Sequence, residues 1–154
     1  MIDIEVEDEA WTAALPEVGS VVERAARAAL AHGDLGADAA LTVLLTSDEA
    51  VRDLNARFRG KDRATNVLSF PAPETAAPHL GDIALARGVC AVEAEAQGKP
   101  LEHHLSHLVA HGVLHLLGWD HETDDEAEEM EGLERRILAE MDIPDPYGSP
   151  DGTA

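Results

Sequence analysis

Apolar residues in the first third of the chain follow strand and helix periods in turn. Residues 2–6 read IDIEV, in which apolar side chains alternate with acids, and this is the period of a half-buried strand. Residues 20–33 are rich in alanine and place apolar side chains near one face, which predicts a helix. The short apolar run ALTVLLT at 40–46 predicts a central strand.

The middle of the chain continues this pattern. Thr46 and Glu49 have the spacing of a capping box, which predicts a helix that opens there and covers 47–58. Residues 65–71 are strand-like, and the proline-rich stretch that follows predicts a surface loop. A further strand is expected at 81–86.

The last third of the chain predicts helices in succession. The first covers about 88–98, and the second covers 100–118, with a proline in its first turn and a glycine suited to a left-handed stop at its end. Thr123 and Glu126 form a second candidate capping box, for a helix that continues to about residue 141.

Strands interleaved with helices and followed by further helices predict the α+β class. We expect a small mixed sheet of about four strands covered by about five helices. The chain has 154 residues, no internal repeat and no convincing linker, so it is expected to be a single domain, 1–154. Residues 142–154 are rich in proline, glycine and acids, and we expect a frayed tail there.

Composition restricts the class of protein further. Apolar residues make up 45% of the chain and aromatic residues only 3%, so the core must be mainly aliphatic. No apolar run approaches the roughly 20 residues that cross a bilayer, and the N-terminus is acidic where a secretory signal would be basic. These features predict a cytoplasmic protein with no membrane segment. The single cysteine, Cys90, excludes an internal disulfide, and we expect it to be a small buried residue.

Charge is distributed unevenly along the chain. The formal net charge is −20, which should repel nucleic acids and membranes on average. Residues 52–63 nevertheless hold five of the eleven Lys and Arg side chains against two acids, whereas residues 120–131 hold eight acids and no cation. The basic segment is therefore the candidate place for an anionic ligand.

Residues 111–121 read HGVLHLLGWDH and carry the strongest chemical signal. His111 and His115 are four residues apart on the expected helix, so their side chains stack on one face. Gly118 allows a sharp turn, after which His121 can return to the same point. Three imidazoles with an open fourth position are typical of a catalytic zinc site, here at the end of a central helix, although Cu, Ni, Co or Fe accept the same ligands.

Three residues near these histidines have two interpretations each. His104 and His107 share the helical stripe of His111 and His115, where they would contact the metal ligands or the substrate, or else be surface or packing residues. Asp120 could orient a ligand imidazole or be an exposed acid in a loop.

The residue after His111 limits the chemistry of a metal site. A zinc peptidase of the H-E-x-x-H type has a glutamate base at this position, which is Gly112 here, so that class is disfavoured. A zinc-bound water still reaches a pKa of about 7, and the metal can also polarise a phosphoryl oxygen. The segment RFRGKDRATN at 57–66 could hold a phosphate group through its arginines, or be a solvated basic loop.

Three motifs in the same order, FRGKDRATNVLSFP, LGDIALA and HGVLHLLGWDH, resemble the YbeY family of bacterial endoribonucleases over about residues 40–141. The resemblance implies a metal-dependent, single-strand-specific endoribonuclease that acts in 3′-end maturation of small-subunit (16S) ribosomal RNA and in ribosome quality control. It also implies one zinc ion held by His111, His115 and His121, and it assigns the family's functional arginine to Arg59. Trp119 stands where the family usually has tyrosine or phenylalanine.

On this interpretation Arg59 stabilises charge on the scissile phosphate, while Lys61 and Arg63 position neighbouring phosphates. The attacking group could be a metal-bound hydroxide or the 2′-OH of the RNA itself. The expected partners are single-stranded RNA, the ribosomal RNA precursor and, because the chain is so acidic, a ribosomal or assembly protein that presents the strand. Two alternatives stay open: a non-catalytic ribosome-assembly factor with a structural zinc, and a zinc metallopeptidase.

Overall fold

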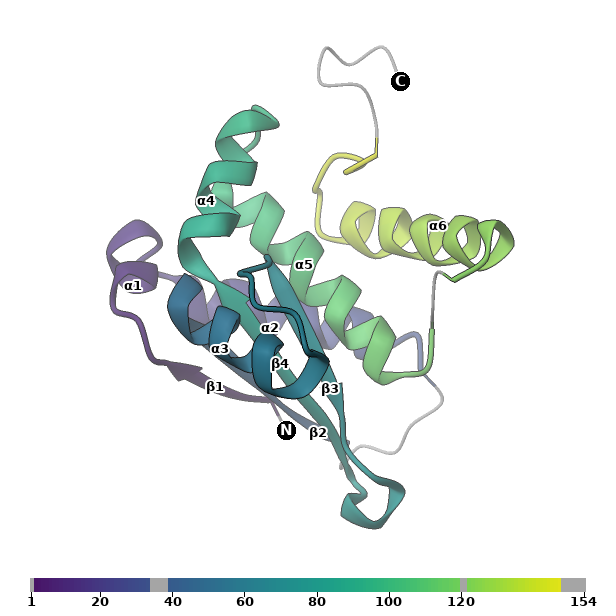
Figure 1. Cartoon of the computed structure of the whole chain (residues 1–154). Coiled ribbons are helices and arrows are strands. Elements are labelled where there is room, and N and C mark those ends of the chain that lie inside the picture. The colour runs from purple at the N-terminus through teal and green to yellow at the C-terminus, as the bar shows by residue number, and fades with distance from the viewer. Residues whose placement is uncertain (1, 34–38, 120–121, 148–154) are drawn as a thin grey trace.

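The computed structural model describes residues 2–33, 39–119 and 122–147, which form a four-stranded sheet packed between helices (Figure 1). The strands are β1 (Ile2–Val6), β2 (Ala40–Thr46), β3 (Val67–Pro71) and β4 (His79–Ala86). The helices are α1 (Ala10–Ala14), α2 (Val18–Leu30), α3 (Asp48–Arg59), α4 (Arg87–Ala96), α5 (Leu101–Leu116) and α6 (Asp124–Glu140), with a 3-10 turn, η1 (Glu74–Ala76), before β4. The α+β class is confirmed, with six α-helices in the described residues where about five were predicted.

The sheet is mixed, with the strand order β1-β2-β4-β3. β1, β2 and β4 run parallel, whereas β3 pairs antiparallel with β4 and forms one edge of the sheet. Ile4, Val43, Ile83 and Ser69 are paired in a row across the four strands. Ser69 therefore marks the middle of the edge strand, level with the centre of the sheet.

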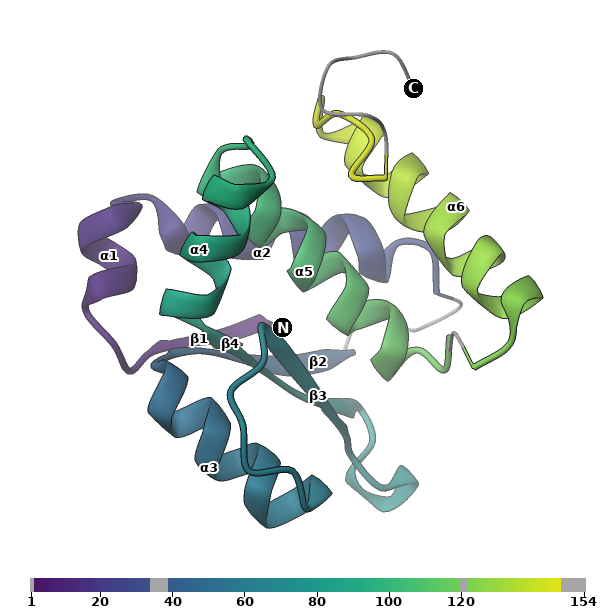
Figure 2. The ribbon, with the colours of Figure 1, turned by 45° about the horizontal axis from the view of Figure 1, so that its top comes forward.

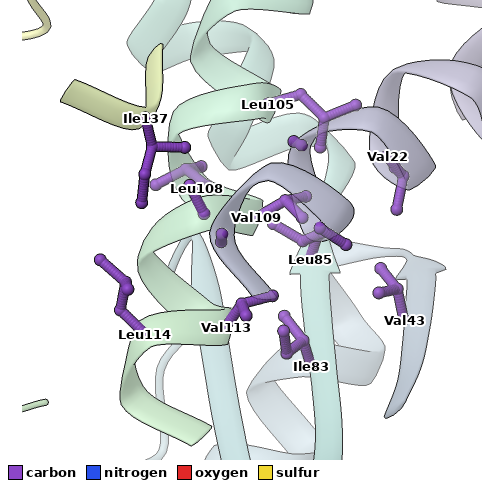
Figure 3. Packing of buried hydrophobic residues seen from close by; sticks show 14 of the residues in the cluster. Val22, Val43, Ile83, Leu85, Leu105, Leu108, Val109, Val113, Leu114 and Ile137 are labelled. Carbon is purple, nitrogen blue, oxygen red and sulfur yellow. The ribbon is translucent and has the colours of Figure 1, made fainter. Parts of the chain in front are cut away.

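The helices divide unequally between the two faces of the sheet. Figure 2 shows α3 beneath the sheet and α2, α4 and α5 above it. On the upper side, Val109 and Val113 of α5 pack with Ile83 and Leu85 in the larger hydrophobic core (Figure 3). A smaller cluster around Val51 of α3 fills the other side. Each fully buried aliphatic side chain contributes about 1.5–3 kcal/mol, so the core holds α5, and the histidines on it, firmly against the sheet.

The start of α3 differs from the prediction. The residue that caps this helix is Ser47, whose hydroxyl accepts a hydrogen bond from the backbone N–H of Ala50 at 3.2 Å, and the predicted cap at Thr46 is wrong. Thr46 is instead the last, buried residue of β2, paired with Ala86 of β4. Because Thr46 pairs within the sheet, the helix cap is one residue later than predicted.

The structure contains one helix that was not predicted and confirms two other local expectations. The sequence did not predict α1, whose Trp11 is buried and donates a hydrogen bond from its indole N–H to the carbonyl of Thr46 at 3.0 Å. Thr123 caps α6 as predicted, accepting a bond from the N–H of Glu126 at 3.1 Å. Cys90 is buried in α4, also as predicted.

Two residues of the C-terminal segment contact α6. The Arg135 guanidinium donates a hydrogen bond to Asp145 at 3.1 Å, and the hydroxyl of Tyr147 donates one to Glu134 at 3.0 Å. Asp145 and Tyr147 thus contact α6, whereas residues 148–154 fall outside the described residues, and the frayed tail over 142–154 stays a prediction. Within the described ranges, no helix is long and apolar enough to span a membrane.

Candidate active site

Two of the predicted metal ligands meet at the C-terminal end of α5. His111 and His115 are one helical turn apart, and their Nε2 atoms face each other at 3.0 Å. Both side chains are partly buried against neighbouring elements. Two nitrogens bound to one tetrahedral zinc at about 2.1 Å each would be roughly 3.4 Å apart. The observed separation is close to that value, so the pair fits a zinc ion with a small adjustment of the rings.

The other ring nitrogens explain why the Nε2 atoms face each other. Nδ1 of His111 donates to the carboxylate of Glu134 at 3.1 Å, and Nδ1 of His115 donates to the carbonyl of Trp119 at 3.0 Å. An acceptor at Nδ1 places the ring proton there and leaves Nε2 as the nitrogen that can bind a metal. Both imidazoles are thus held in the form and direction that a metal site requires.

Glu134 is the centre of the hydrogen-bond network behind His111. Its side chain is only 1% exposed, and the same oxygen that accepts from His111 also accepts from Nε2 of His107 at 2.8 Å. Its second oxygen accepts from the hydroxyl of Tyr147. Burial alone would raise the pKa of Glu134, but the hydrogen bonds from His107 and His111 outweigh burial and lower the pKa to about 2. Glu134 is therefore a buried carboxylate that carries its negative charge behind His111.

The third predicted ligand, His121, and the acid Asp120 lie outside the described residues. Among the residues that are described, no three His, Cys, Asp or Glu side chains gather closely enough to hold a metal. Gly118 has a φ of 102°, which is the left-handed stop predicted for the end of this helix. The role of His121 as a ligand stays a prediction.

Arg59 approaches from the opposite side of the edge strand. It is the last residue of α3, which ends at Gly60 with a left-handed φ of 68°. Its Nη2 donates to the carbonyl of Ser69 on β3 at 2.6 Å, and its guanidinium carbon lies 5.5 Å from the centre of the Phe70 ring. The free edge of β3 therefore fixes the direction of the Arg59 side chain.

A single cavity joins the arginine to the histidines. Its volume is about 730 Å³, and it opens along the β3 edge between the end of α3 and the end of α5. Its lining includes Arg59 and Lys61 on one side, His111 and His115 on the other, and Ser69 between them. Two sequence segments about fifty residues apart thus line one cavity, which brings cations and candidate metal ligands into the same site.

Not every predicted residue is part of this cavity. Arg63 does not line it; the backbone carbonyl of Arg63 accepts a hydrogen bond from Asn55 at 2.9 Å. His107 lies behind His111, where it binds the same carboxylate. His104 is buried and its Nε2 donates to Glu93 at 2.9 Å. From the sequence, each of these two histidines could support the metal ligands or serve in packing. The contacts favour a supporting role for His107 and a packing role for His104.

Gly112 has a packing reason to be glycine. A Cβ atom at this position would lie 3.0 Å from Cδ1 of Ile83 and 3.2 Å from the hydroxyl oxygen of Ser69. The glycine lets α5 lie directly on β3 and β4, where the Ser69 hydroxyl also reaches the Gly112 carbonyl at 3.4 Å. A glutamate base at this position would not fit this packing, which is a second reason against the peptidase hypothesis.

Glu134 is the site residue that the sequence analysis missed. It belongs to a helix with many acids, so its composition gave no sign of a special role. Its position in the helix did indicate such a role, because Glu134 falls on the same helical face as the buried residues Met130, Ile137 and Leu138. An acid on an apolar helix face needs a buried partner, and here the partners are histidines of α5.

Comparison with known proteins identifies the family of this site. The family model described as endoribonuclease YbeY matches residues 3–142, which is nearly the whole chain. The chain belongs to the endoribonuclease YbeY family. Membership makes it an endoribonuclease, a hydrolase that acts on RNA. The sequence resemblance to this family is therefore confirmed over more of the chain than the motifs covered.

Individual YbeY relatives agree with this assignment. Endoribonuclease YbeY of Chelativorans sp. (strain BNC1) is 58% identical over 132 residues, covering 82% of this chain and 81% of its own length. Endoribonuclease YbeY of Azorhizobium caulinodans is 52% identical over 155 residues, covering 97% of each chain. The solution structure of TM1509 from Thermotoga maritima is 26% identical and superposes with a TM-score of 0.57, covering 96% of this chain and 99% of that one.

Proposed function

We propose that this chain is a zinc-dependent endoribonuclease specific for single-stranded RNA, and that it acts in the cytoplasm in 3′-end maturation of 16S ribosomal RNA and in ribosome quality control. The observation that carries the proposal is the cavity that Arg59 and Lys61 line together with His111 and His115. Cations opposite a metal position are the arrangement that phosphodiester hydrolysis needs.

In this proposal the histidines hold the metal, and the cations of the cavity bind the RNA phosphates. Zinc bound by the histidines would supply a Lewis acid and lower the pKa of a bound water. His111, His115 and His121 would hold it, the first two through the Nε2 atoms that already face each other. Arg59 binds the scissile phosphate with the N–H groups of its guanidinium fork, and its bond to Ser69 fixes the direction of that fork. Lys61 binds a phosphate further along the strand.

The acidity of the chain supports the proposed dependence on a partner. A net charge of −20 opposes the approach of RNA, and the cavity lining offers two cations, Arg59 and Lys61, against it. We therefore propose that a ribosomal or assembly protein presents the strand of the ribosomal RNA precursor. Arg63 lies outside the cavity lining, so its proposed role is to position phosphates of the strand beyond the cavity.

Metal analysis combined with a cleavage assay tests this proposal. Purified protein should contain one zinc per chain, cleave a single-stranded RNA faster than a duplex of the same sequence, lose activity to a chelator and regain it with zinc. His111→Ala should lose both zinc and cleavage, whereas His103→Ala, a histidine elsewhere on α5, should keep both. A wild-type protein that carries zinc yet cleaves nothing, even with ribosomes and candidate partners supplied, would favour the non-catalytic assembly factor.

The product ends separate the two attacking groups. A 2′,3′-cyclic phosphate requires attack by the neighbouring 2′-OH of the RNA. Full activity on a substrate with a single 2′-deoxy nucleotide at the cut requires attack by water. In cells, depletion of the protein should cause 3′-extended 16S precursor to accumulate, and the His111→Ala variant should fail to correct this.

A further inference from the structure

An exposed aromatic side chain lies next to the catalytic arginine. Phe58 is 66% exposed and directly precedes Arg59 at the end of α3. Its ring stands edge-on to that of Phe70, with the ring centres 5.7 Å apart and the planes at 68°. These are the only two phenylalanines in a chain whose aromatic content is 3%, so aromatic surface is concentrated at this point.

The aromatic pair lies beside the cavity lining, on the α3 side of the β3 edge. Phe70 is on β3, between Ser69 and Pro71, which both line the cavity. Arg59 bridges the two, because it bonds to the Ser69 carbonyl and lies over the Phe70 ring. A strand that left the histidines and crossed the free edge of β3 past Arg59 would reach the Phe58–Phe70 pair just outside the cavity lining.

Core packing does not account for the exposure of Phe58. Phe70 is partly buried and packs against the small hydrophobic cluster beneath the sheet, whereas most of the Phe58 ring faces solvent. Cationic side chains next to an open aromatic face are the combination with which proteins bind unpaired nucleic acids, since the cations bind phosphates and the ring stacks on a base. Arg59 and Lys61 supply the cations here.

We propose that Phe58, supported edge-on by Phe70, is a stacking site for an unpaired nucleobase next to the phosphate bound by Arg59. This inference rests on the proposed function, because it needs a single-stranded RNA in the cavity. The stacked base anchors the strand on the α3 side of the β3 edge. It also gives the site a preference for unpaired RNA, because a base within a duplex does not offer its face to a ring.

The alternative role of Phe58 is to cover Phe70, and two substitutions separate these roles. Phe58→Leu keeps an apolar cover but removes the flat ring, whereas Phe58→Tyr keeps the ring. Val92→Ala is the matched control, because Val92 is a 67% exposed apolar residue on α4, away from the cavity lining. Thermal unfolding of each variant reports any change in folding.

The test measures cleavage of a single-stranded RNA by the zinc-loaded proteins, together with stopped-flow fluorescence of the same RNA carrying 2-aminopurine at successive positions. Loss of one stacked base corresponds to a rise in KM of about fivefold or more. We expect that rise for Phe58→Leu, with kcat unchanged, and wild-type values for Phe58→Tyr and Val92→Ala. One 2-aminopurine position should be quenched on binding to the wild type and not on binding to Phe58→Leu.

Other outcomes overturn the stacking site. If the wild type cleaves single-stranded RNA and Phe58→Leu matches it in KM and quenching, the stacking site is refuted while the proposed function stands. If Phe58→Leu keeps RNA binding but loses co-sedimentation with ribosomal subunits, the ring contacts a protein and the stacking site is again refuted. If the wild type neither binds nor cleaves such RNA, even with ribosomes and candidate partners supplied, both proposals fail.

Discussion

The carboxylate of Glu134 accepts a hydrogen bond from Nδ1 of His111 at 3.1 Å, on the side of the ring away from His115. This bond joins α6 to α5 and turns the other nitrogen of His111 toward the cavity. Because the same carboxylate also binds His107 and Tyr147, the direction of one candidate metal ligand depends on groups from two helices and the C-terminal segment.

Removing the charge of Glu134 should weaken metal binding. Glu134→Gln keeps the shape of the side chain but replaces the carboxylate with a neutral amide, so the hydrogen bonds from His107 and His111 lose the charge that strengthens them. Loss of such a supporting carboxylate typically costs about 10- to 100-fold in metal affinity, and we expect a zinc Kd raised within that range in competition with a fluorescent chelator. Glu128→Gln, an exposed acid on the same helix, is the control. Equal zinc affinity in both variants would show that Glu134 does not support the site.

The phenol of Tyr147 should titrate well above its ordinary pKa of about 10. Burial raises the pKa of Tyr147, and the nearby charge of Glu134 and the hydrogen bond to it raise it further. Tyr147 is the only tyrosine in the chain, so the absorbance of the phenolate reports it directly. The native protein should show a midpoint above that of the same protein in urea.

The sign of this shift also fixes an effect on stability. Because the folded state holds the Tyr147 proton more tightly than the unfolded state, the free energy of unfolding should fall as pH rises past about 10. Tyr147→Phe should lose that part of the alkaline dependence. A native midpoint equal to that in urea would mean that the C-terminal segment is not held against Glu134 in solution.

Gly112→Ala should destabilise the fold, although alanine favours helices. Its methyl group would meet Ile83, which is fully buried and unable to move aside, and the Ser69 hydroxyl. Gly132→Ala on α6 is the matched control, because a methyl group there meets nothing within 4 Å. Both variants gain helix propensity, so their difference isolates the clash, which we expect to be about 1–3 kcal/mol in urea unfolding. Equal stabilisation of both would show that α5 is not packed this closely on the sheet.

The sequence could predict the parts of the site that depend on local periodicity. His111 and His115 fall on one helical face because they are four residues apart, and the basic turn at Arg59 is visible from charge alone. The sequence could not predict that the histidines and Arg59 line one cavity, because this depends on β3 being the edge strand and on α5 lying directly over it. The error at Thr46 has the same origin, since only the pairing of β2 with β4 decides where the strand ends.

The role of Glu134 depended on long-range packing in a similar way. Nothing in the helix itself separates Glu134 from the exposed acids around it except its place among apolar residues. Its two histidine partners lie 23 and 27 residues earlier in the chain, on a different helix. Tyr147 was hidden by a composition typical of a disordered tail, and it lies beyond the residues 3–142 that match the family.

The cleavage rate of Arg59→Ala tests the central claim most directly. Arg57→Ala is the matched control, because Arg57 lies on the same helix, is exposed and pairs with Asp53 at 3.3 Å, outside the cavity lining. Removing one group that stabilises charge at the reacting centre costs about 100- to 1000-fold in rate. We predict such a loss in single-stranded RNA cleavage for Arg59→Ala, with zinc content and thermal stability of the wild type, and little change for Arg57→Ala. Wild-type cleavage by a folded, zinc-loaded Arg59→Ala would contradict the account.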